Sequence, residues 1–88
     1  MGDRSLLIAA ERLFEAMGLA SSEALIHRFV SPYQKGWVLR RKWIEDDRPR
    51  QEDMTQVHPD RDSLWRSIED QRAAFNKIAA GFARDLGI

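Results

Sequence analysis

Residues 36–44 read Gly-Trp-Val-Leu-Arg-Arg-Lys-Trp-Ile, and the interpretation of the whole chain starts from this stretch. It holds two of the three tryptophans and three consecutive cations. Trp37, Leu39, Arg41 and Trp43 fall on one side of an alternating pattern, which favours a β-strand. A short helix is the alternative, because the tryptophans and leucine would also fit one. In a strand, the two tryptophans share one side with Arg41.

A polar run follows this strand. Residues 45–53 contain no apolar residue and one proline, which predicts a solvated loop with a mobile tip. Residues 54–58 are then expected to return as a second short strand. The two strands would form a β-hairpin.

Two helices are predicted before the hairpin. From Asp3 to Met17, apolar residues recur at helical spacing, with Asp3 as the N-cap and Gly18 ending the helix. A shorter helix capped by Ser21 is predicted to stop at Ser31-Pro32, because proline disfavours helical backbone in the residue before it. Its proposed apolar face consists of Ser22, Leu25, Ile26, Phe29 and Val30.

A long amphipathic helix is predicted from Ser63 to Leu86. It would span about 36 Å, whereas a compact chain of this length is about 30 Å across, so part of the helix should overhang the core. A partner or a second copy would cover the overhang. The residues assigned to self-association are Phe75, Phe82 and Leu86.

Together these elements predict a single small α+β domain over residues 1–88, with two N-terminal helices, a β-hairpin and a long C-terminal helix. An all-α fold is the alternative. The sequence shows no repeat and no Gly/Ser linker at which a second domain would begin.

Composition narrows the classes of function. The 88 residues carry 14 cations and 14 anions, so no global positive field attracts nucleic acid or an anionic membrane. No segment is apolar enough to span a bilayer, and the lack of cysteine fits a reducing compartment. We expect a cytoplasmic protein without membrane contact.

Catalytic and cofactor signatures are weak. The five glycines are scattered, so no phosphate-binding loop is formed, and no serine lies in a nucleophile elbow. His58, Asp60 and Asp62 stand near a helix entrance, but a stable metal site usually needs more ligands. We therefore expect no enzyme activity, no metal and no cofactor.

The tripeptide His58-Pro59-Asp60, followed by Arg61 and a helix, resembles the signature loop of J-domain co-chaperones. Residues 13–19 are also similar to the start of a J domain. The resemblance implies stimulation of a heat-shock chaperone through this loop. The other interpretation is that Pro59 only begins the last helix, where its missing N–H is tolerated.

Aromatic and cationic residues of the strand and its tip predict a binding surface. Stacking surfaces beside cations fit nucleic acid, in a winged-helix or β-ribbon arrangement, but the five acidic residues of the run would repel phosphate. Arginine and tryptophan also dominate protein interfaces, so a regulatory or adaptor protein that binds another protein is the preferred function. The predicted partner-binding residues are Trp37, Arg40, Arg41, Lys42, Trp43, Arg48 and Arg50.

Overall fold

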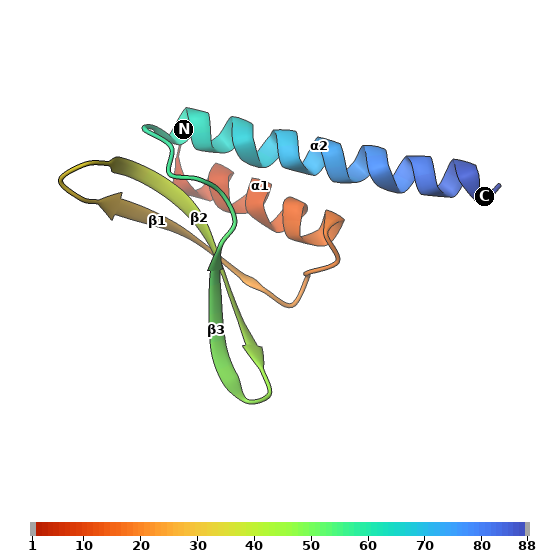
Figure 1. The fold of residues 1–88 in the computed structure, drawn as a ribbon, viewed down its shortest axis with the longest axis horizontal. Helices are drawn as coiled ribbons and strands as arrows, with labels where there is room; N and C mark the ends of the chain where they lie inside the picture. The colour runs from red at the N-terminus through yellow and green to blue at the C-terminus, as the bar shows by residue number, and fades with distance from the viewer. Residues whose placement is uncertain (1, 88) are drawn as a thin grey trace.

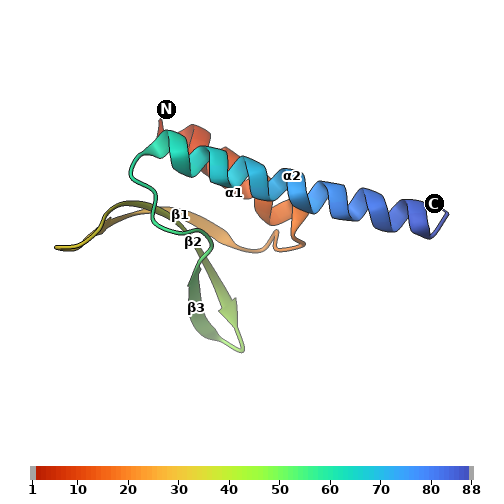
Figure 2. The same cartoon turned by 45° about the horizontal axis from the view of Figure 1, so that its top comes forward.

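The fold is α+β, as expected, with two helices covering one face of a three-stranded antiparallel sheet. The computed structural model describes residues 2–87 (Figure 1). The elements in chain order are α1 (Asp3–Ala16), β1 (Glu23–Val30), β2 (Lys35–Glu45), β3 (Arg48–Asp53) and α2 (Arg61–Asp85). The helices run side by side in the same direction, and the end of the β2–β3 hairpin projects away from them (Figures 1 and 2). We call this projecting hairpin, residues 40–53, the arm.

The core lies between the helices and the β1-paired half of β2. Helix α1 contributes most of it, because its apolar residues recur on the face that meets α2 and β1. Leu39 is the fully buried contribution of β2 to this cluster. The buried cluster consists of Leu6, Ala9, Ala10, Leu13, Phe14, Leu39, Leu64 and Ile68.

Strand β2 is the centre of the sheet. It pairs with β1 from Lys35 to Lys42 and with β3 from Arg40 to Glu45, so its two halves have different neighbours. Residues directly opposite each other share a face, and successive residues alternate between faces. The side of Leu39 faces the helices, and we call it the helix face. The opposite side is the far face.

The expected second helix is wrong, because residues 23–30 form strand β1. Its apolar residues suit a helix face, but their backbone pairs along the whole strand with β2. Ala24 and Ile26 pack toward the core, whereas Leu25 on the far face stays exposed. With partial burial on both faces, the strand lacks the clean alternation that would have identified it.

The expected loop at residues 45–53 is also wrong. Asp46 and Asp47 form a two-residue turn with φ of 51° and 60°, and β3 follows directly. Positive φ at both positions is what a type I′ hairpin turn requires, and Asp tolerates it better than most residues.

The expected strand at residues 54–58 is largely replaced by an irregular segment that crosses the edge of β2. The backbone of His58 accepts from Trp37 N–H (2.7 Å) and donates to Trp37 C=O (2.8 Å), which forms a single bridge. Gly36 permits this approach, because a Cβ at that position would collide with the His58 carbonyl.

The helix ends partly follow the expectation. Asp3 lies in the first turn of α1 and is not its N-cap, which is Gly2. Gly18, with φ of 74°, follows the C-terminus of α1 as expected. Helix α2 has 25 residues against 14 in α1 and extends well past its end, so the expected overhang is confirmed (Figure 1). Neither helix of residues 2–87 has the length and apolar character needed to cross a membrane.

Candidate functional site

The register divides the predicted partner-binding residues between the two faces of the sheet. Trp37, Arg41 and Trp43 share the helix face, as the alternation predicted. The arginines of β3 join them there, because Arg48 lies opposite Glu45 and Arg50 lies opposite Trp43. Arg40 and Lys42 point to the far face.

Arg41 is held by three neighbours. Its Nε donates to Ser22 Oγ (2.6 Å), its Nη1 lies 4.0 Å from Glu52 Oε2, and its guanidinium carbon lies 3.8 Å from the centre of the Trp43 ring. Only 13% of the side chain is exposed. Arg41 therefore joins the base of the arm to the segment before β1, and Trp43 is half-buried beneath its guanidinium group.

Arg40 is engaged on the far face. Its Nε donates to Asp53 Oδ1 at 2.8 Å across the β2–β3 pair. Arg50 approaches Glu45 at 3.8 Å near the tip. Acidic residues between 45 and 53 thus form separate ion pairs with arginines of the same arm. Lys42 is exposed and takes part in none of the ion pairs formed within residues 2–87.

Trp37 belongs to a different part of the molecule. The guanidinium carbons of Arg28 and Arg61 lie 5.2 Å and 4.5 Å from its ring centre. Arg61 also forms an ion pair with Asp3, in which Nη2 lies 3.0 Å from Oδ1. Trp37 packs against the core and connects the start of α2 to the sheet, and it lies six residues from Trp43 along β2.

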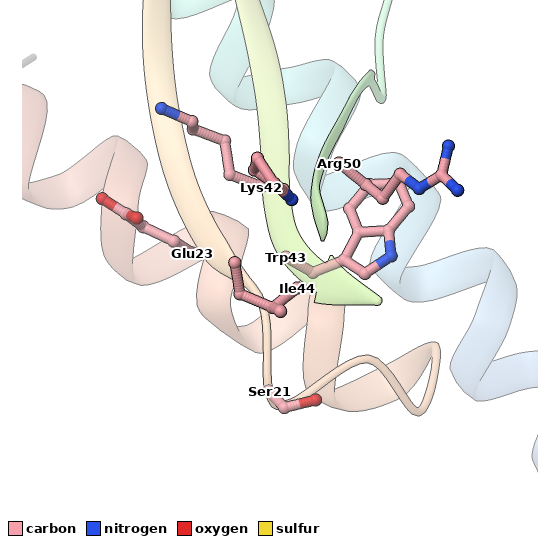
Figure 3. Close-up of a pocket in the computed structure, with 7 residues that line it drawn as sticks. Ser21, Glu23, Lys42, Trp43, Ile44 and Arg50 are labelled. Atoms are coloured by element: carbon pink, nitrogen blue, oxygen red, sulfur yellow. The ribbon is translucent and has the colours of Figure 1, made fainter. Parts of the chain in front are cut away.

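A hollow of about 390 Å³ lies beside the arm, where β1 stops pairing with β2 (Figure 3). The last pair is Glu23 with Lys42, and β2 continues for three more residues with β3 alone. Trp43 and Arg50 project to one side of the strand and Ile44 to the other, so the hollow wraps around the β2 edge. Its lining residues are Ser21, Glu23, Lys42, Trp43, Ile44, Pro49 and Arg50.

Three of these lining residues were predicted, and four were not. Ile44 lies on the far face and is 69% exposed, so it is available for contact. Pro49 lay in the expected loop, and only the pairing of Ile44 with Pro49 reveals it as part of a surface. Ser21 and Glu23 were placed in a helix. A strand assignment for residues 23–30 would have brought them to this edge.

The tripeptide His58-Pro59-Asp60 lies between the bridge to Trp37 and the start of α2. The irregular segment at residues 54–57 precedes it, whereas a J domain has a helix at that place. Asp60 is the N-cap of α2, and its carboxylate accepts from Ser63 N–H (2.7 Å). That hydrogen bond holds the pKa of Asp60 below its usual range. Within the tripeptide, His58 thus forms the bridge to β2 and Asp60 caps α2.

The predicted self-association residues lie on the overhanging part of α2. Phe75 is 37% exposed, Phe82 65% and Leu86 71%. The overhanging end of α2 and the arm project from the fold in different directions (Figure 1). Within residues 2–87, acidic and histidine side chains form no cluster suited to a metal ion.

Comparison with known proteins identifies no relative. No family model, curated protein or solved structure matches the chain.

Proposed function

We propose that this chain is a small, non-enzymatic adaptor that binds an extended segment of another protein at the hollow beside the arm. One observation carries the proposal. Lys42, Trp43 and Arg50, three of the residues predicted to bind a partner, line that single hollow.

The edge of β2 supports an extended ligand. Among the described residues, none pairs with residues 43–45 on the side where β1 has ended. Backbone N–H and C=O groups at such an edge are ready to pair with an added strand. An extended segment placed there would continue the line of β1 along β2.

The lining residues define the chemistry of the segment. Trp43 and Ile44 offer apolar contact on the two sides of the strand, and Lys42 is an exposed cation free of ion pairs within residues 2–87. A half-buried aromatic beside arginine is typical of residues that dominate protein interfaces. The matching ligand is an extended peptide with one apolar and one acidic side chain.

A protein ligand is favoured over a polyanion by the pairing of charges on the arm. Arg40, Arg41 and Arg50 each approach a carboxylate of the same arm. A phosphate chain would have to displace these carboxylates or lie beside them, at an electrostatic cost. A peptide with one acidic side chain needs only Lys42.

Peptide display tests this function directly. Random twelve-residue peptides are selected on the whole protein, and a bound peptide is titrated while backbone amide NMR shifts are recorded. We expect shifts at residues 42–45 and 49–50. Lys42→Glu should weaken binding about tenfold, because an attractive charge becomes repulsive.

Lys35→Glu is the matched control, since Lys35 is an exposed lysine at the other end of the same strand. It should bind the peptide as the wild type does. The site would be refuted if bound peptides shifted the amide signals of other residues. An equal loss of peptide affinity in Lys42→Glu and Lys35→Glu would also refute it. A gel shift that weakens steeply with salt would support nucleic acid in its place.

A further inference from the structure

The second half of α2 presents an apolar stripe to solvent. Phe75, Ile78, Phe82 and Leu86 recur at helical spacing and are between 37% and 71% exposed. Four large apolar side chains in one line form a contiguous patch, which marks interaction sites on small proteins.

This stripe continues the buried face of the same helix. At 100° per residue, Leu64, Ile68 and Phe82 each lie within about 20° of the direction of Phe75. Leu64 and Ile68 are fully buried in the core that α1 completes. The apolar face therefore continues along the part of α2 that extends past the end of α1, a part of the helix that Figure 2 shows.

The composition of the flanks makes the stripe self-complementary. Ala79 and Ala83 border it on one side and Ala74 on the other, and small residues allow two helices to approach closely. Lys77 and Arg84 fall on the opposite side of the helix, about 180° from Phe75. Two copies would bring apolar surface together without opposing like charges.

The rest of the fold sets the orientation of the pair. The core lies on the same side of α2 as the stripe, but over its first half. In a parallel pair, the two cores would occupy the same space between the helices. In an antiparallel pair they lie at opposite ends, and the second copy's helix continues the line of α1.

We propose that two copies of this chain associate through the second halves of α2 in an antiparallel pair that buries Phe75, Ile78, Phe82 and Leu86. The inference is independent of peptide binding at the arm. The overlapping halves have about the length of α1, so each copy covers the part of α2 that α1 leaves open.

Sedimentation equilibrium of the whole protein tests the pair. We expect a monomer–dimer equilibrium, and Phe82→Asp should raise its midpoint concentration at least about 100-fold, because both copies lose an apolar contact and gain a charge. Ala80→Asp, on the opposite side of α2, should leave the midpoint unchanged. Both positions are exposed, so both variants should keep the fold.

Cysteine crosslinking tests the orientation, since the chain has no cysteine of its own. Ala79→Cys lies near the expected two-fold axis and should form a disulfide between copies. Leu86→Cys lies at the end of the overlap and should not. A wild-type monomer at high micromolar concentration, or a dimer retained by Phe82→Asp, would overturn the proposal. Crosslinking at Leu86→Cys would overturn the antiparallel arrangement.

Discussion

The guanidinium carbon of Arg41 lies 3.8 Å from the centre of the Trp43 ring, on the face of the sheet that also carries the helices. Arg41 is largely buried and bonded to Ser22, so the stack is restrained at the base of the arm. The arrangement makes Trp43 part of the arm's support as well as part of its hollow.

A double-mutant cycle measures this stack. Arg41→Met and Trp43→Leu should each destabilise the fold, with a coupling energy of about 0.5–2 kcal/mol from urea denaturation. Arg40→Met provides the control cycle with Trp43→Leu, because Arg40 points to the far face. Its coupling should be under about 0.5 kcal/mol. Equal coupling in both cycles would argue against the stack.

Two glycines should respond to alanine in opposite directions. Gly36→Ala places a Cβ against the His58 carbonyl and should cost about 1–3 kcal/mol in the free energy of unfolding. Gly81→Ala meets nothing within 4 Å near the C-terminal end of α2 and should stabilise the helix by at most about 1 kcal/mol. Chemical denaturation compares the two, and a neutral Gly36→Ala would contradict the close approach.

The turn of the arm offers a stabilising substitution. Asp47 has φ of 60°, a backbone conformation that costs a residue with a Cβ about 1 kcal/mol and costs glycine little. Asp47→Gly should therefore raise the urea midpoint without changing the m-value. Asp53→Gly, in the extended β3, should instead lower it, because this removes the ion pair with Arg40. An unchanged midpoint in Asp47→Gly would indicate a different turn.

Asp60 should make stability depend on pH in the acid range. Its folded pKa is lowered from 3.8, mainly by the hydrogen bond from Ser63 N–H, so the carboxylate stabilises the fold above about pH 4. This contribution is lost as the pH falls through the folded pKa. Asp60→Asn keeps an acceptor but does not titrate, so its melting temperature should fall less between about pH 6 and pH 2. An equal fall in melting temperature in the wild type and in Asp60→Asn would exclude this contribution of Asp60.

Local patterns were enough to predict α1, β2 and α2. In α1 and α2 the buried residues share one face, as Leu13 shows for α1, so the spacing of apolar residues identifies the helix. In β2 both Val38 and Leu39, on opposite faces, are buried, and the alternation of Trp37, Leu39 and Trp43 identifies the strand. The shared side of Trp37, Arg41 and Trp43 followed from the same alternation. Regular spacing of large apolar side chains is thus what made these three elements predictable.

The remaining strands depend on partners that the local sequence does not reveal. In β1, Leu25, Ile26 and Phe29 fit a helical face equally well, and only pairing with β2 selects the strand. All residues of β3 are exposed, so no apolar pattern marks it. The hollow beside the arm lies where the pairing of β1 with β2 ends. Ser21 and Glu23 could therefore be assigned to the hollow only once the register of β1 against β2 was known.

The pairing of α1 with α2 can form only late in the synthesis of the chain. Leu6 and Leu64 meet in one buried cluster, although 58 residues separate them along the chain. At the usual 5–20 residues per second, the ribosome needs roughly 3 to 12 seconds between these two leucines. The two hairpins join residues that are close along the chain, so they can form in that interval, whereas the part of α1 that α2 covers stays open until α2 is made.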